Sequence, residues 1–565
     1  MARSVFAAFA TALLLSASAG ATPTLDLTLK PVVIDGVISA ISVTARYGLE
    51  GGSLPPLSLP EKIGPLFHIA DRIEGLGASD DVGALNFVAT SGTNAVKQAT
   101  PLGNDVRLWT ADKQTKGVVT VRYTARVSNE PIPGPSWEVR SEARGVSAAG
   151  ITFLVLPEDK TEYKTTLHWD LSELPKEAEA VTSLPPELQN LTAERLRHTY
   201  YMAGVLQSSP SNSGPFRAVS TAQSPLYEQK ELLAFSVKAY EGMMRLFGPP
   251  KEPQFTVMFR GSKISDISGT ELPGGLIATM KPTTPLSAVE GLTAHEMVHV
   301  FMNGLDSESW FEEGLAVMYQ SRAPYLAGMF TPEQYIDDVN KTARTYYSNA
   351  RYDMPMDEAT KAFWTDARAR LQSYVRGGLY FYQLDAKLRA KTNGLRGLDQ
   401  VLREFVADRN AGRSVTVKEF LALVSRDLGD EAEADYHAML AGERIIVSDG
   451  AFGPCFRRKL EKMPVFELGF AMKSLMQQPR IIAELDPQSP AAKAGLRDGD
   501  KVLTATPLDG AQENPDREMS LTVERNGKPV EIRFKPKGKT VLEGYQWVRI
   551  PSVPETQCRV QENKA

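Results

Sequence analysis

Two histidines, His295 and His299, lie four residues apart and enclose Glu296 in the pattern H-E-x-x-H. On a helix, residues with this spacing lie on one face, one turn apart, so both imidazoles can bind the same Zn²⁺. Glu296 is then free to accept a proton from the water that zinc activates. The pattern predicts a zinc hydrolase. The alternative is a buried helix whose histidines are satisfied inside the core, because the flanking residues are apolar.

A third protein ligand is required, because a hydrolytic zinc has three of them and keeps one position open for water. The segment W-F-E-E-G-L-A at residues 310–316 offers two acids, Glu312 and Glu313, shortly after the first motif. Glu313 is the better candidate, and the two segments together favour a zinc peptidase over a buried helix.

Local signals predict two helices that position these ligands. The first begins between residues 285 and 288 and ends before Asn303, where Asn-Gly is a stop signal. Ser309 and Glu312 have the spacing of a capping box, so a second helix begins there. Glu312 can reach back to the helix start, which leaves Glu313 to face the metal.

Hydrolysis at zinc produces an oxyanion, which needs a hydrogen-bond donor. Tyr374, in the segment S-Y-V-R-G-G at residues 373–378, is the candidate. On the residues alone, a tyrosine in a helix is more often a packing residue.

With these motifs the chain resembles the gluzincin clan of zinc peptidases, and within it the glycyl-aminopeptidase family that carries a C-terminal PDZ domain. The likeness rests on four segments: residues 295–299, the W-F-x-E-G pattern ending at Gly314, the Tyr-x-x-Gly pattern of residues 374–377, and the run from Leu384 to Leu402. The resemblance implies a thermolysin-like catalytic domain, Zn²⁺ on His295, His299 and Glu313, and Tyr374 as the oxyanion donor. A general gluzincin-like peptidase is the competing assignment.

The same resemblance implies a substrate-binding segment. Aminopeptidases of this clan carry Gly-Gly-Leu-Glu on an edge strand, and its Glu binds the free α-amino group of the substrate. The similar segment here is Gly274-Gly275-Leu276, followed by Ile277, and the nearest acid is Glu271. We expect Gly274, Gly275 and Leu276 to contact substrate. The missing Glu leaves aminopeptidase and endopeptidase action both open.

The C-terminal region resembles a PDZ domain. Leu468-Gly469-Phe470 is similar to the loop that binds a peptide carboxylate, and residues 489–503 are similar to a bacterial PDZ segment. A peptide C-terminus is therefore an expected partner, although a PDZ domain kept only for stability is an alternative. Cys455 and Cys558 bracket this region, and we predict that they form a disulfide rather than two unpaired thiols.

Length and composition set the domain organisation. A chain of 565 residues is too long for one core. We predict a signal peptide over 1–21 and a β-sandwich over 22–183, where period-two alternation around Val121 is typical of a half-buried strand. A catalytic domain over 184–444 with a mostly helical C-terminal half and a PDZ domain with flanking segments over 445–565 complete a multidomain α+β fold.

Charge and hydropathy narrow the partners and the location. The net charge of −5 gives no electrostatic case for nucleic acid, and no later segment is apolar enough to span a membrane. The sequence thus predicts an exported, periplasmic or secreted zinc metallopeptidase that cleaves peptides or proteins. Aminopeptidase action on small N-terminal residues (Gly or Ala) is favoured. The alternatives are an endopeptidase with PDZ-guided substrate choice, a hydrolase that acts on another bond, and a PDZ-containing binding protein with a vestigial zinc site.

Overall fold

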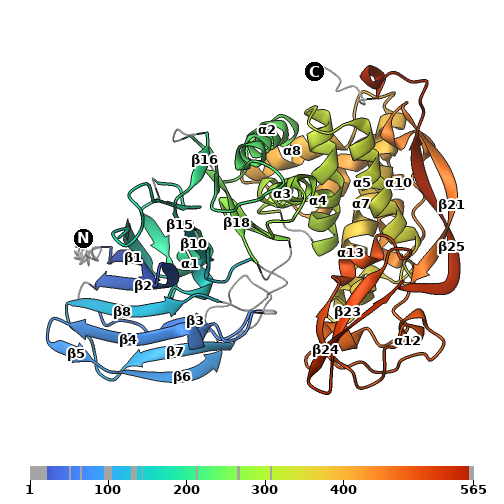
Figure 1. Ribbon diagram of the computed structural model, residues 1–565. Helices are drawn as coiled ribbons and strands as arrows, with labels where there is room; N and C mark the ends of the chain where they lie inside the picture. Colours follow the sequence, from blue (N-terminus) through green and yellow to red (C-terminus); the bar gives the residue numbers. More distant parts are fainter. Residues whose placement is uncertain are drawn as a thin grey trace, which may run out of the picture. The chain divides into compact units, whose positions relative to one another are not determined.

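The computed structural model has the predicted multidomain α+β character (Figure 1). It describes residues 22–49, 52–63, 66–93, 105–128, 136–142, 144–186, 188–210, 214–252, 254–263, 267–305 and 308–558. The predicted signal peptide, residues 1–21, lies outside these residues. Among the described residues, no helix is long and apolar enough to cross a membrane.

The chain divides into two compact units, which interleave in sequence. The first comprises Met1–Ser128, Ala149–Lys176 and Pro186–His198, and the second comprises Asn129–Ala148, Glu177–Pro185 and Thr199–Ala565. Residues 129–148 and 177–183 therefore group with the second unit, although the sequence placed them in a first domain over 22–183. Residues 186–198 group with the first unit, although the sequence placed them in the domain over 184–444.

The first unit is β-rich. One sheet has the order β14-β12-β1-β2-β8-β4-β5 and another has the order β11-β3-β7-β6. The alternation that predicted a strand around Val121 lies in β8 (Val118–Arg126), where every second side chain, from Val119 to Ala125, is buried. The other strands are β1 (Thr24–Ile34), β2 (Val37–Gly48), β3 (Leu57–Pro60), β4 (Ile73–Asp80), β5 (Gly83–Leu85), β6 (Phe87–Thr93), β7 (Asp105–Ala111), β11 (Leu156–Pro157), β12 (Glu162–Trp169) and β14 (Asn190–Thr192).

The second unit contains a mixed sheet in the order β16-β17-β18-β20-β19. Helix α2 (Gln229–Phe247) connects β17 to β18 in a parallel crossover, as a βαβ unit requires. β20 runs parallel to β18, and β19, which precedes β20 in the chain, pairs with it antiparallel. Among the described residues β19 is thus the outermost strand on that side. The bounds are β16 (Gln207–Ser209), β17 (Phe216–Ser220), β18 (Phe255–Gly261), β19 (Ser268–Leu272) and β20 (Gly275–Met280).

A second sheet of this unit has the order β13-β15-β10-β9, with bounds β9 (Arg140–Glu142), β10 (Gly145–Ala149), β13 (Glu179–Thr182) and β15 (Tyr200–Gly204). Helices then follow from residue 286 to residue 441, which confirms the predicted helical half. A continuous apolar core packs them together and against β17, β18 and β20. They include α3 (Leu286–Met302), α4 (Ser309–Leu326), α5 (Pro332–Tyr347), α7 (Ala367–Lys391), α8 (Leu398–Asn410), α9 (Val417–Leu428) and α10 (Glu431–Ala441).

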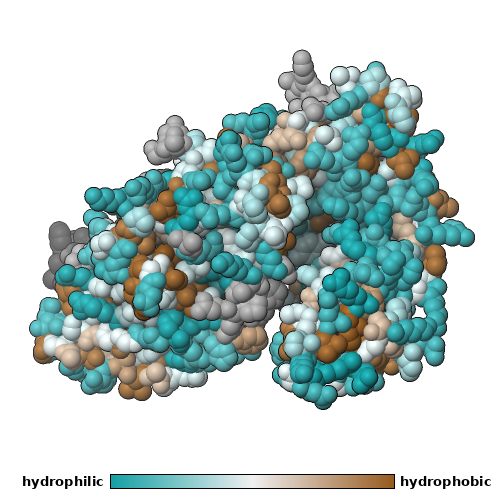
Figure 2. Space-filling model, viewed as in Figure 1, coloured by the Kyte–Doolittle hydropathy of each residue, from teal (hydrophilic) through white to brown (hydrophobic). Residues whose placement is uncertain are grey.

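The C-terminal region pairs two long strands, β21 (Phe456–Phe466) and β25 (Lys537–Arg549), into a ribbon. Leu460 and Val541 on this ribbon are each 53% exposed, and Figure 2 shows scattered apolar residues along it. The sequence between these two strands forms β22 (Lys501–Ala505), β23 (Met519–Arg525) and β24 (Lys528–Phe534), with the short helices α12 (Pro490–Lys493) and α13 (Leu508–Gln512). These elements surround a small apolar core of their own, which includes Leu468 and Phe470.

Two features hold this region in place. Cys455 and Cys558 form a disulfide, with Cα atoms 4.9 Å apart. Asn340 on α5 pairs with the backbone of Trp547 in both directions, accepting from its N–H and donating to its carbonyl at 2.8 Å each. The ribbon is therefore fixed to a helix of the helical half.

Candidate metal centre and active site

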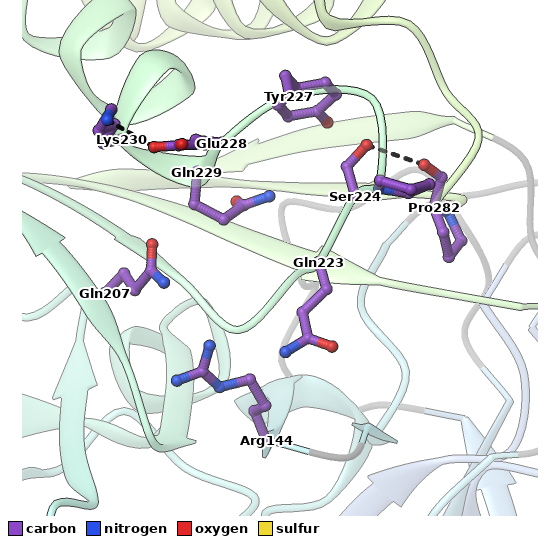
Figure 3. Close-up of a pocket in the computed structure, with 10 residues that line it drawn as sticks. Arg144, Gln207, Gln223, Ser224, Tyr227, Glu228, Gln229, Lys230 and Pro282 are labelled. Carbon is purple, nitrogen blue, oxygen red and sulfur yellow. Dashed lines mark hydrogen bonds and ion pairs between the residues drawn. The ribbon is translucent and has the colours of Figure 1, made fainter.

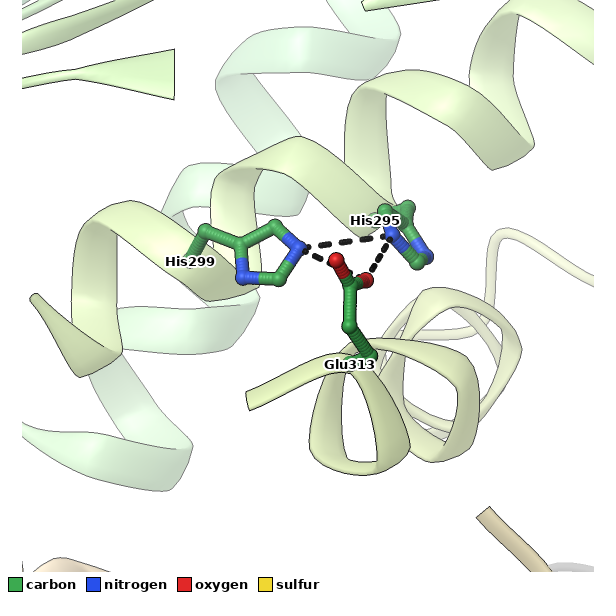
Figure 4. A group of neighbouring side chains, drawn as sticks. All are labelled: His295, His299 and Glu313. Carbon is green, nitrogen blue, oxygen red and sulfur yellow. Dashed lines mark hydrogen bonds and ion pairs between the residues drawn. The ribbon is translucent and has the colours of Figure 1, made fainter. Parts of the chain in front are cut away.

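His295 and His299 on α3 and Glu313 on α4 converge on one point (Figure 4). The three pairs of facing atoms, His295 Nε2, His299 Nε2 and Glu313 Oε2, are each 3.4 Å apart. Ligand atoms bound to a tetrahedral Zn²⁺ at about 2.0–2.1 Å lie about 3.3–3.4 Å from one another. Glu313 Oε2 is also buried, and its two contacts with the imidazole nitrogens are longer than an ordinary hydrogen bond. The donor set thus fits a zinc ion.

Two glycines allow the helices that carry this site to touch. A Cβ on Gly314 would lie 2.6 Å from the backbone of Gly377, and a Cβ on Gly377 would lie 2.5 Å from the carbonyl oxygen of Trp310. Any side chain at either position would push α4 and α7 apart. The close approach brings Glu313 on α4 near Tyr374 on α7.

Tyr374 lies beside the candidate metal centre. Its ring stacks near that of His295, with centroids 6.3 Å apart and planes 17° apart. Burial raises the pKa of Tyr374, and the Glu313 carboxylate raises it further. The phenol therefore keeps its proton and can donate a hydrogen bond.

Glu296 is 7% exposed and faces β19. A Cβ on Gly269 would lie 2.6 Å from Glu296 Cγ, so only glycine fits opposite this carboxylate. Burial raises the pKa of Glu296 to about 7, against the opposing effect of His295. Such a pKa suits a general base near neutral pH.

The two histidines and Glu313 stabilise one another's charged forms. Burial lowers the pKa of His299, but the Glu313 carboxylate outweighs it and brings the value to about 10. Burial raises the pKa of Glu313, yet His299 and His295 together bring it below its ordinary value. Protons and Zn²⁺ therefore compete for the same three ligands, as in metal sites generally.

Gln320 and Asp338 orient one ligand, and sequence reasoning missed both. His295 Nδ1–H donates to Gln320 Oε1 at 2.9 Å, and Gln320 Nε2 donates to Asp338 Oδ2 on α5 at 3.0 Å. This chain leaves His295 Nε2 free for the metal. One signal was available: Gln320 is seven residues after Glu313, two turns along the same face of α4.

The segment Gly274–Leu276 does not form an open sheet edge. β20 pairs with β18 on one side and with β19 on the other, so its backbone has no free side for substrate. Leu276 is fully buried, and a Cβ on Gly275 would lie 2.6 Å from the carbonyl oxygen of Thr256. The outermost strand on this side of the sheet is β19, which carries Glu271.

The loop expected to bind a peptide carboxylate is packed into the small C-terminal core. Leu468 and Phe470 are 3% and 9% exposed, and Gly469 has φ +79°. A Cβ on Gly469 would lie 2.2 Å from Ser489 Cβ, so the loop and the segment beginning at Ser489 require this glycine. A PDZ domain here stays a prediction.

A separate hollow of about 780 Å³ opens beside the start of α2 (Figure 3). Its lining includes Arg144, Gln207, Gln223, Tyr227 and Lys230, and none of the predicted site residues. Lys230 is paired with Glu228 there. The chemistry described above thus lies elsewhere in the second unit.

The fold resembles that of one solved structure over nearly its whole length. An aminopeptidase N family protein from Idiomarina loihiensis aligns with 93% of this chain and 98% of its own, with a TM-score of 0.65 and 14% identity. An M1 zinc metallopeptidase from Deinococcus radiodurans covers 76% of this chain and 94% of its own at 17% identity, but its TM-score of 0.41 is too low to establish a shared fold. No protein-family model matches the chain, and no curated protein matches it. The chain therefore has the fold of an aminopeptidase N family protein.

Proposed function

We propose that the protein is an exported zinc metallopeptidase that removes single residues from the N-terminus of peptides. The observation that carries the proposal is the convergence of His295, His299 and Glu313 at tetrahedral spacing, with Glu296 and Tyr374 beside them. The aminopeptidase N family fold agrees with this activity. A binding protein with a vestigial metal site has no need for such an intact set.

In this mechanism each side chain has one task. His295, His299 and Glu313 would hold Zn²⁺, which when bound polarises the scissile carbonyl and lowers the pKa of water. Glu296 accepts the proton of the attacking water and then gives it to the leaving amine. The Tyr374 hydroxyl donates to the carbonyl oxygen as negative charge develops on it.

Glu271 is the proposed anchor for the free amine of the substrate. Successive side chains of a strand alternate between faces, so Glu271 shares a face with Gly269, which lies against Glu296. Its charge acts on the pKa values of both Glu296 and His299. A carboxylate at this place can pair with an ammonium group one residue before the scissile bond.

The remaining parts of the proposal rest on resemblance. We propose small N-terminal residues (Gly or Ala) as the preferred substrates, and a PDZ domain within 445–565 that takes a peptide C-terminus at Leu468–Phe470. Endopeptidase action is the alternative, because Ile277 stands where the resemblance places an acid. Glu271 on the neighbouring strand favours the aminopeptidase.

The test is cleavage of one peptide mixture with free and acetylated N-termini, with and without a chelator, read by mass spectrometry. We expect chelator-sensitive loss of single residues from the free peptides only. Glu296→Gln should keep zinc and lose turnover. Internal cuts in both sets would establish an endopeptidase instead.

Glu271→Gln separates the amine anchor from the metal chemistry. It should raise KM for free peptides and leave the zinc content unchanged. Glu290→Gln, an acid in the first turns of α3, serves as the matched control and should leave KM as it is. Equal KM values for both variants would remove Glu271 from the site.

A further inference from the structure

We infer that Tyr200, supported by Trp137, closes the outer edge of β19 and so limits the substrate to one residue before the scissile bond. This specificity role rests on the proposed function, because it explains why only one residue is released. It concerns residues outside every motif found in the sequence.

Tyr200 contacts the edge strand directly. Its hydroxyl donates to the carbonyl oxygen of Thr270 at 2.9 Å, and Trp137 Nε1 donates to the same hydroxyl oxygen at 3.2 Å. Both side chains are buried, at 0% and 6% exposure. Thr270 stands between Gly269, which faces the general base, and Glu271, the proposed amine anchor.

An occupied edge carbonyl stops a peptide from extending along the strand. Extended substrates add to a sheet edge through main-chain hydrogen bonds, and each edge carbonyl is one such partner. At Thr270 that partner is already taken by a phenol. A peptide reaching further would have to displace Tyr200 and leave buried polar groups unpaired, which is costly.

Further polar contacts hold β19 and the segment that carries Trp137 in place. Ser136 donates its backbone N–H to Thr270 Oγ1 at 3.1 Å, and its Oγ lies 2.8 Å from Ser268 Oγ. Thr279 on β20 donates to Ser136 Oγ at 3.0 Å. The wall formed by Trp137, Tyr200 and β19 is therefore fixed in place.

The surroundings keep Tyr200 in its donor form. Burial raises the pKa of Tyr200, and the nearby Glu271 and Glu296 carboxylates raise it further. Its hydrogen bond to Thr270 places the phenol at the residue between Gly269, which lies against Glu296, and Glu271.

The test uses the zinc-loaded full chain and tetra-alanine, with Tyr200→Phe as the isosteric variant and Tyr200→Leu as the smaller one. Products are read at the start of the reaction, before the tri-alanine left by the first cut is itself trimmed to di-alanine. Wild type should then release alanine only. Both variants should form di-alanine in addition, with the ratio of di-alanine to alanine rising about tenfold, the equivalent of one lost hydrogen bond. Tyr201→Phe, on the opposite face of β15, is the matched control and should keep the wild-type pattern.

The outcomes separate this inference from the function it rests on. If wild type shows no chelator-sensitive trimming, the proposed function fails. If wild type releases alanine and the folded, zinc-loaded Tyr200 variants give the same products, only the role of Tyr200 is overturned. A gain of di-alanine release is a change that general loss of stability does not produce.

Discussion

The two walls of the proposed active site are built differently. The strand wall consists of β19, Tyr200 and Trp137, joined by hydrogen bonds between buried, neutral groups. The helix wall is α7, where Arg370 lies one turn before Tyr374 and pairs with Asp509 of α13 at 2.6 Å. Asp509 is 49% exposed, so water and salt reach this pair. The strand wall is thus fixed, whereas the helix wall depends on a C-terminal contact that salt can weaken.

A substitution of Tyr374 on the helix wall should have the largest effect on turnover. Tyr374→Phe removes the oxyanion donor, and we expect kcat to fall by about 10²–10³. Tyr380→Phe on the same helix is the control. The Tyr380 hydroxyl is buried and has no partner among the described residues, so its loss should cost nothing in turnover. Steady-state kinetics decide, and equal kcat values in both variants would refute the role of Tyr374.

A substitution in β19 of the strand wall should have the next largest effect on activity. Gly269→Ala places a methyl group against Glu296, and a displacement of the base of about 1 Å can reduce kcat/KM by about 10². Zinc content should stay unchanged. Gly291→Ala on α3 is the control, since nothing lies within 4 Å of the added carbon. Full activity of Gly269→Ala would show that β19 can shift to accommodate the added methyl group.

Zinc affinity should depend on Gln320, which contacts the ligand His295. Gln320→Leu removes the acceptor for His295 Nδ1–H, and we expect zinc affinity to fall by about 10–100-fold. Gln320→Glu keeps an acceptor and should recover part of the affinity. Competition with a chromophoric chelator measures both. No difference between the two variants would argue against orientation of His295.

A buried acid beside the end of β18, outside the strand wall, should make the stability of the protein depend on pH. Burial raises the pKa of Glu142, whose carboxylate accepts from Gly261 N–H at the end of β18, from 4.5 to about 7. The folded state therefore binds more protons than the unfolded state in this window, so stability falls as pH rises from about 4.5 to 7. Glu142→Gln should remove that slope and be more stable above pH 7 by up to about 3 kcal/mol. Denaturant unfolding at pH 5 and pH 8 tests it, and parallel slopes would contradict it.

The smallest effect should come from the exposed ion pair. Asp509→Asn should change kcat/KM by less than about fivefold at low salt, because such pairs contribute about 0.2–1 kcal/mol. Wild type at high salt should approach the variant. Asp516→Asn is the control, since Asp516 pairs with Lys537 inside the C-terminal region. A salt response that survives in Asp509→Asn would place its origin elsewhere.

Local signals predicted the convergence of His295, His299 and Glu313 but not the strand wall, and the reason is physical. Helix spacing is encoded within a few residues, so α3 and α4 and the positions of these three side chains followed from the sequence. The expected capping box was wrong in detail, because Glu308 and not Ser309 is the N-cap of α4, and it makes no side-chain cap bond. Strand neighbours are set by long-range pairing. Nothing within 268–280 says that β19 and not β20 is outermost, so Gly274–Leu276 was expected at the edge.

Other contacts required the folded chain. Asp338, Tyr200 and Trp137 carry no motif, and they reach the site from segments far from it in sequence. Gln320 was accessible from the sequence, because it lies two turns after Glu313 on the same face of α4. The disulfide was within reach, because Cys455 and Cys558 are the chain's two cysteines.

That disulfide has a consequence for damage tolerance. Its two cysteines are 103 residues apart, and α13 with Asp509 lies on the loop between them. A protease that nicked this loop once would leave both fragments covalently joined, so the Asp509 segment would not be released from the molecule. A nicked protein would migrate intact under non-reducing conditions and as two pieces after reduction, while its activity persisted.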